Sequence, residues 1–167
     1  MYYLNCFFIY SILGFLLETI VAFITKSGFK SGFLTGPWTP VYGIGAITIL
    51  FVSNYLFKNL HMNRILETVI MFFVVAIILS FIEALGGVLI EKIFGIVFWD
   101  YSNQRFNIGH YISLEMTLAW GVISIIFIYL VHPLLDSLIK KIPSWITIIF
   151  LTLFFIDCVK TFISKKE

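Results

Sequence analysis

The sequence predicts an all-α fold: a polytopic integral membrane bundle of about five transmembrane helices with short loops. Of the 167 residues, 60% are hydrophobic and 12% are charged, and the mean hydropathy is +1.03. A soluble domain carries roughly twice that share of charged residues, so the composition excludes a soluble globular enzyme. Because each crossing takes about 20 residues, the crossings use most of the chain. We therefore expect one membrane-embedded domain over residues 1–167.

Five apolar runs separated by polar residues mark the expected helices. The first run stops near Gly28, because glycine and short polar residues end helices readily. Pro40 marks the start of the second with Thr39 as its N-cap, since proline is tolerated in a first helical turn. The predicted spans are residues 3–24, 38–57, 65–90, 111–131 and 144–162, with ends good to about three residues.

Two of the predicted connections differ from a simple short loop. Residues 98–107 form the least apolar stretch of the chain and predict a loop or an interfacial hairpin. Pro133 and Pro143 bracket the fourth connection. Within it, residues 134–142 place leucines and isoleucines at helical spacing with charges opposite, which predicts a short helix lying in the headgroup layer.

The distribution of basic residues predicts an orientation. Five crossings place the N-terminus and the second and fourth connections on one side, called face A, and the first and third connections and the C-terminus on face B. Face A would carry Lys58, Arg64, Lys140 and Lys141, and face B would carry Lys26, Lys30, Lys92, Arg105, Lys160, Lys165 and Lys166. This excess favours face B as the cytoplasmic side of a cell membrane.

The charge distribution and the motif content argue against nucleic-acid binding and against ATP hydrolysis by this chain. The net charge is +2 and like charges form no block, so the lipid bilayer is the expected partner and nucleic acid is not. Cys6 and Cys158 are interpreted as small apolar packing residues. The chain also lacks a P-loop, so we expect no ATPase activity of its own.

Carboxylates inside the apolar runs are the main functional signal. Counted along the predicted spans at 1.5 Å per residue, Glu18, Glu83 and Asp157 lie about 8 to 10 Å beneath face B. Such groups turn inward to partners or to a wet cavity, because a charge facing lipid is costly. We predict a polar vestibule open to face B, able to hold a cation, a proton or an amine-bearing solute. Its residues would be Glu18, Glu83, Tyr10, Tyr42, Asp100, Asn107 and His110.

Structural explanations stand beside the functional one. Glu18 and Glu83 could be protonated, or could hydrogen bond across helices simply to lock the bundle. Glu115 lies about 200° from the polar stripe of its helix. Asp157 could pair with Lys160, three residues on.

Three further residue types allow more than one interpretation. Asp100 could act as an acid or form an Asx turn with Ser102. His110 could join carboxylates around a metal, but ligand spacing such as H-E-x-x-H is missing from the sequence, and we expect no metal and no cofactor. Trp38 near a span end fits an aromatic belt, whereas the deeper Trp120 is interpreted as packing.

Ordered motifs from Tyr10 to Pro133 resemble a known family. The blocks are YSxxGxxxE at 10–18, GFLxGP at 32–37, PVYGxG at 40–45, WDYS at 99–102, FN at 106–107 and ISL at 112–114. Together they are similar to the putative ABC-transporter type IV family, also called CmpB-like. The motif-loop residues are Gly32, Gly36, Pro37, Pro40, Trp99, Tyr101 and Ser102. Ser31, and His110 with Tyr111, stand where the family pattern has Arg and Gly-Arg, although Lys30 lies next to the first of these positions.

This resemblance implies a transporter permease-like subunit whose ATPase is a separate chain. A homo-oligomer would suit it, because five helices alone enclose little cavity. Two alternatives remain open. One is a membrane-embedded enzyme acting on a lipid or lipid-linked substrate through Asp100, His110 and a buried glutamate. The other is a membrane assembly or regulatory protein whose motif loops dock a partner.

Overall fold

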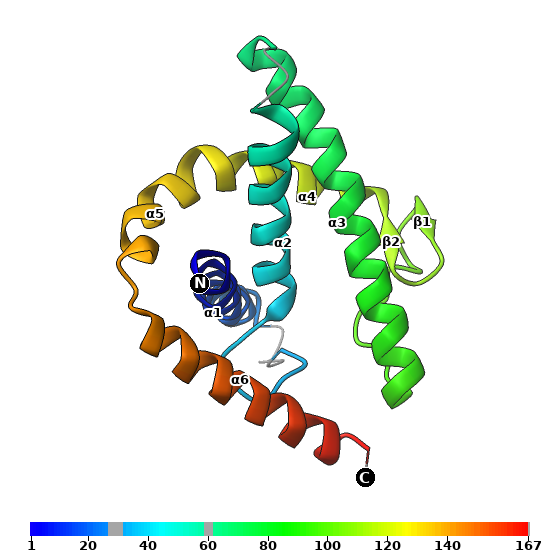
Figure 1. Ribbon diagram of the computed structural model, residues 1–167. Coiled ribbons are helices and arrows are strands. Elements are labelled where there is room, and N and C mark those ends of the chain that lie inside the picture. Colours follow the sequence, from blue (N-terminus) through cyan, green and yellow to red (C-terminus); the bar gives the residue numbers. More distant parts are fainter. Residues whose placement is uncertain (27–31, 59–61, 167) are drawn as a thin grey trace. The chain divides into compact units, whose positions relative to one another are not determined.

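The computed structural model describes residues 1–26, 32–58 and 62–166, and of residues 55–57 only the backbone. It is 76% helical, which confirms the all-α membrane fold (Figure 1). The predicted helix end at Gly28, the departure from the family pattern at Ser31 and the neighbouring Lys30 lie outside the described residues.

The first three helices begin close to where the apolar runs begin. They are α1 (Tyr2–Thr25), α2 (Pro40–Phe51), which continues as the π-helix η1 (Val52–Phe57), and α3 (Arg64–Phe94). Local chemistry sets both ends of α3. The Asn63 side chain accepts a hydrogen bond from the Leu66 amide at its start, and Gly95 adopts the left-handed region (φ 68°) at its end.

A long helix follows, Leu114–Lys140. It consists of α4 (Leu114–Ile126), the π-helix η2 (Phe127–Val131) and α5 (His132–Lys140), and α6 (Ser144–Ser164) comes after it. The sequence predicts that the fourth span ends near residue 131, with Pro133 at the start of the connection, whereas the helix continues through Pro133 to Lys140. Proline is tolerated there because it sits in the first turn of α5, directly after a π-turn that already loosens the regular hydrogen-bond ladder.

Within the described residues, four helices are long and apolar enough to cross a membrane: α1, α3, Leu114–Lys140 and α6. The predicted second span is represented by a shorter apolar helix, Pro40–Asn54, so the count of five crossings stays a prediction. The amphipathic helix predicted at 134–142 is present as α5.

A small hairpin precedes α4. Strands β1 (Asn107–Ile108) and β2 (Ile112–Ser113) pair antiparallel, with Asn107 opposite Ser113. The Ser113 hydroxyl then accepts a hydrogen bond from the Met116 amide and caps α4. For this reason α4 begins at Leu114, three residues later than the apolar run suggested, and β1 begins at the last residue of the predicted 98–107 stretch.

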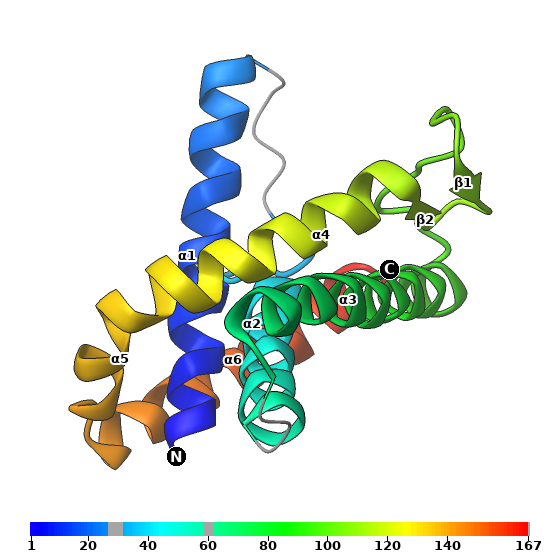
Figure 2. The same cartoon turned by 90° about the horizontal axis from the view of Figure 1, so that it is seen from above.

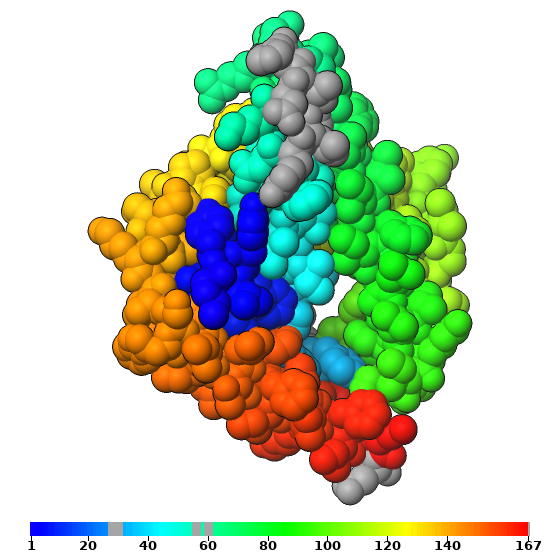
Figure 3. All heavy atoms as spheres, in the orientation of Figure 1, coloured from blue at the N-terminus to red at the C-terminus, as the bar shows by residue number. Residues whose placement is uncertain are grey.

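The chain divides into two compact units, each described here by itself. The terminal unit comprises Met1–Ile47 and Leu135–Glu167. Its core consists of Phe8, Leu34 and Trp38, against which aromatic residues of α6 and Cys158 pack. The first turns of α1, in blue, lie against α5 and α6, in orange and red (Figure 3), where Asn5 hydrogen bonds to Thr147.

The central unit is Thr48–Leu134. Helices α3 and α4 run antiparallel in it, with the hairpin at the end where α4 begins (Figure 2). Hydrogen bonds join Thr68 to Tyr129 and Ser80 to Thr117 along this pair. Gly121 lets α4 approach closely, because a Cβ there would lie 2.6 Å from the Phe72 ring.

Candidate functional site

Glu83 is a buried carboxylate in the middle of the central unit. It lies in α3 with 7% of its surface exposed. The Tyr101 hydroxyl donates to Oε1 at 2.7 Å, and the Trp120 indole Nε1 donates to Oε2 at 2.8 Å. The acid therefore holds together α3, α4 and the segment before the hairpin through neutral donors, and no cation pairs with it in the described part of the chain.

A second contact fixes the hairpin to α3, nearer the C-terminal end of that helix. The Tyr111 hydroxyl donates to Glu91 at 2.9 Å, and the Tyr111 ring lies over Gly87, where a Cβ would approach the ring to 2.4 Å. Trp99 contributes to the same layer, with its ring 6.2 Å from that of Tyr111. The WDYS segment is therefore seated by aromatic packing as well as by Glu83.

Asp100, Ser102 and His110 gather on the exposed side of this loop. Asp100 Oδ1 accepts from the Ser102 amide at 2.8 Å and also from its hydroxyl, which completes the Asx turn considered from sequence. His110 Nδ1 lies 2.7 Å from the Ser102 hydroxyl and 3.3 Å from Asp100. Hydrogen bonds from Ser102 lower the pKa of the Asp100 carboxyl below its ordinary value, with His110 as a smaller cause.

This cluster is not arranged as a nucleophilic relay. In such a relay the two nitrogens of histidine contact serine and aspartate separately, whereas here a single nitrogen of His110 faces both, and Ser102 already donates to Asp100. Asn107 has a similar shaping role, since its side-chain amide donates to the Gly109 carbonyl at 2.8 Å in the hairpin turn. Both features order the loop.

Glu18 is the corresponding acid of the terminal unit. It is half-buried in α1, and the Thr39 hydroxyl donates to its Oε2 at 3.3 Å, with Tyr42 as a further hydrogen-bonding neighbour. The Tyr42 ring lies over Gly14, where a Cβ would come within 2.4 Å of it. Thr39, the residue directly before α2, thus binds the acid, and its role as N-cap of α2 stays a prediction.

Asp157 lies beneath the GFLTGP loop. Its Oδ2 accepts from the Gly36 amide at 2.9 Å and from the Trp38 indole at 3.0 Å. One turn further along α6, the Thr161 hydroxyl hydrogen bonds to Thr35. The structure thus gives loop residues as the partners of Asp157, where the sequence suggested Lys160, and Trp38 is a buried core residue rather than part of an interfacial belt.

The remaining predicted residues of the terminal unit lie in different environments. Gly32 and Gly36 allow close packing, because a Cβ would lie 3.2 Å from the Thr39 hydroxyl and 2.3 Å from the Trp38 indole nitrogen, respectively. Pro37 is exposed and Pro40 starts α2. Tyr10 is buried in α1.

Sequence reasoning missed the neutral partners of the acids, above all Trp120, Trp38 and Thr39. One general signal was available for the two tryptophans, because a buried indole N–H usually finds an acceptor. Glu115, by contrast, is exposed in the first turn of α4, in keeping with its place off the polar stripe.

Helices long and apolar enough to span a membrane, with partnered acids inside them and loops bound onto those acids, define a class: α-helical membrane proteins with polar groups within their helices. The chain belongs to the family described as "Putative ABC-transporter type IV", whose model matches residues 5–162. This confirms the resemblance seen in the motifs. Searches of curated proteins and of solved structures gave no match.

Proposed function

We propose that this chain is the permease-like membrane subunit of an ABC-type transporter, working with a separate ATPase chain. Family membership supports the transporter class. The observation that carries the permease role is the partnering of Glu83, a buried acid of α3 that is bound by Tyr101 from a motif loop. A purely structural acid could be satisfied within its own helices, whereas this one ties a helix to a loop.

This bond suggests how a solute would be sensed. A cation, an amine or a proton arriving at the Glu83 carboxylate competes with the Tyr101 hydroxyl for the same oxygen. Losing that hydrogen bond leaves the WDYS segment held by its aromatic packing, so binding loosens the loop. In the terminal unit, Glu18 and Thr39 form an equivalent acid and loop pair, and Asp157 holds Gly36 and Trp38 in the same loop.

The first test is purification of the tagged full-length chain from its native membrane in mild detergent. We expect an ATPase chain with a P-loop to co-purify, and ATP hydrolysis by the complex in lipid vesicles. Recovery of the chain repeatedly without any ATPase would contradict the proposal. The mass of the particle also tests the expected homo-oligomer.

The second test distinguishes the role of the Glu83 charge from the role of its hydrogen bond to Tyr101. Tyr101→Phe removes only the hydroxyl that binds Glu83, and Glu83→Gln removes the charge. We expect either change to lower transport-coupled ATP hydrolysis about ten- to one hundredfold, since one hydrogen bond to a charged group is worth about 1.5 to 3 kcal/mol, while the ATPase still co-purifies. Glu115→Gln is the matched control, because that exposed carboxylate of α4 should be dispensable.

A further inference from the structure

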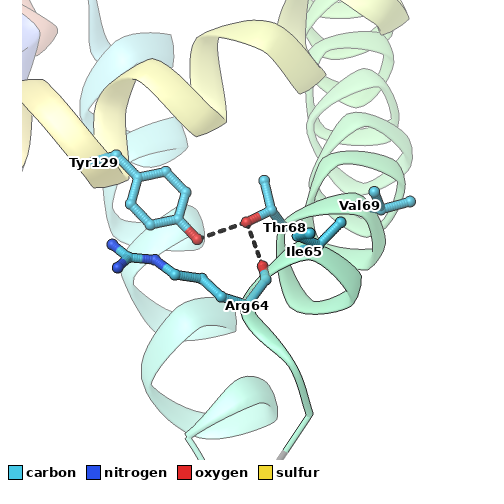
Figure 4. Close-up of a pocket in the computed structure, with 5 residues that line it drawn as sticks. All are labelled: Arg64, Ile65, Thr68, Val69 and Tyr129. Atoms are coloured by element: carbon cyan, nitrogen blue, oxygen red, sulfur yellow. Dashed lines mark hydrogen bonds between the residues drawn. The ribbon is translucent and has the colours of Figure 1, made fainter.

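The central unit has an open groove at the end opposite its hairpin. The groove measures about 510 Å³, within the usual range for ligand sites. Its lining comes from the first turns of α3 and from η2: Arg64, Ile65, Thr68, Val69 and Tyr129 (Figure 4). None of these residues belongs to the acid and loop assemblies described above.

One wall of the groove is polar and cationic. The Arg64 guanidinium lies over the Tyr129 ring, 5.3 Å from its centre, which holds the cation in place while leaving its N–H donors available. The Tyr129 hydroxyl and the Thr68 hydroxyl are 2.8 Å apart, and Thr68 also donates to the Arg64 carbonyl. Arg64 is exposed and makes no ion pair within the described residues.

Among the charged and polar groups near the groove, Arg64 is the one placed to bind an anion. The half-buried Glu67 is one turn along α3 and is not joined to Arg64 by a salt bridge in the described part of the chain. Asn63 already accepts from the Leu66 amide, so this helix start offers fewer free amides. Lys58 is a second exposed cation, at the end of η1, but it does not line the groove.

The other wall is apolar. Ile65 is 79% exposed and Val69 47% exposed, so a small soluble anion bound at Arg64 would leave both side chains uncovered. The 31 residues of α3 extend about 46 Å at 1.5 Å per residue, close to the full bilayer thickness with headgroups of about 40 to 45 Å. Arg64, the first residue of α3, therefore falls at headgroup depth with hydrocarbon beside it.

We infer that this groove binds an anionic phospholipid. Arg64 binds the headgroup phosphate, the Thr68 and Tyr129 hydroxyls face the glycerol ester region, and an acyl chain covers Ile65 and Val69. The site is distinct from the transport proposal and would exist even if no solute were transported.

Native mass spectrometry of the delipidated full-length chain tests this inference. The protein is titrated with palmitoyl-oleoyl phosphatidylglycerol, with the phosphatidylcholine analogue, or with inorganic phosphate. We expect the wild type to bind phosphatidylglycerol in preference to both, and Arg64→Gln to lose about fivefold in affinity, as expected for one basic residue at an anionic lipid. Lys58→Gln is the matched control and should bind like the wild type.

Three outcomes would overturn the inference: equal binding by Arg64→Gln and wild type, an equal loss in Lys58→Gln, or equal competition by inorganic phosphate. A second measurement uses only the wild-type protein, so it does not depend on whether a variant folds. Wild-type protein in phosphatidylcholine vesicles containing a photoreactive phosphatidylglycerol should be labelled mainly in peptides covering residues 64–69 and 129. Uniform labelling of the exposed apolar helices would exclude a specific site.

Discussion

At the scale of single residues, neutral donors satisfy the acids within the helices. Glu83 is bound by a phenol and an indole, Asp157 by an indole and a backbone amide, and Glu18 by a threonine hydroxyl. Such donors stabilise a carboxylate without neutralising it, so each acid retains the ability to attract a cation or a proton.

Removing the Glu83 side chain should destabilise the central unit. Glu83→Ala removes the carboxylate that accepts from the buried Trp120 indole and from the Tyr101 hydroxyl, and losing such a hydrogen bond costs about 1 to 3 kcal/mol. Glu83→Gln retains one acceptor oxygen and should lose less. Thermal unfolding in detergent, followed by tryptophan fluorescence, measures the order wild type, Gln, Ala. An Ala variant as stable as the Glu115→Ala control would contradict these contacts.

The hairpin loop should show a specific dependence on pH. Because hydrogen bonds from Ser102 lower the pKa of Asp100, the charged form stabilises the loop above the ordinary aspartate pKa. That contribution is lost as pH falls through the lower folded pKa. Ser102→Ala should move the pKa of Asp100 up toward its ordinary value, as measured by carbon NMR of labelled aspartate. An unchanged pKa would rule out Ser102 as the main cause.

At the scale of elements, glycines decide how closely helices approach. A Cβ at Gly43 would lie 2.2 Å from the Ser11 hydroxyl and 2.5 Å from the Phe7 carbonyl oxygen of α1. The carbonyl belongs to the backbone of a helix, so it cannot move aside like a flexible side chain. Close packing of α1 on α2 therefore requires glycine at position 43.

Two alanine substitutions test this packing. Gly43→Ala should separate α1 from α2 and cost about 1 to 3 kcal/mol. Gly86→Ala is the control, because its Cβ would meet only Trp99 at an ordinary 3.7 Å, and alanine favours helix by up to about 1 kcal/mol. Unfolding of both variants in detergent measures the difference. A Gly43→Ala variant as stable as Gly86→Ala would mean that the helices do not meet there.

Sequence patterns predicted the helices well because bilayer length and apolar runs dominate their formation. The differences lie where local geometry takes over. Pairing of Ile112–Ser113 with β1 makes α4 begin later than its apolar run. The π-helices η1 and η2 lie within apolar runs, and the hydrophobic pattern does not distinguish a π-helix from an α-helix. Pro133 reads as a break, yet the preceding π-turn lets the helix continue through it.

At the scale of the whole molecule, the sequence predicted that acids lie within the helices but not which groups bind them. Glu18, Glu83 and Asp157 stand out because charge is rare in apolar runs. In the sequence, the partner of Glu18 is 21 residues away, those of Glu83 are 18 and 37 residues away, and those of Asp157 are 119 and 121 residues away. Hydropathy carries no information about such pairings, which depend on how loops fold back onto helices.

The proposed transport function depends most on which side of the membrane the two motif loops occupy. An odd number of predicted crossings places the GFLTGP and WDYS loops together on one side of the membrane, and α5 on the other. Single cysteines at Ser31, which lies outside the described residues, at Ser102 and at Ser137 can be labelled with a membrane-impermeant maleimide in a chain carrying C6A and C158A. We predict that Ser31→Cys and Ser102→Cys react from the same side and Ser137→Cys from the other. Labelling of Ser31→Cys and Ser102→Cys from opposite sides would contradict the account.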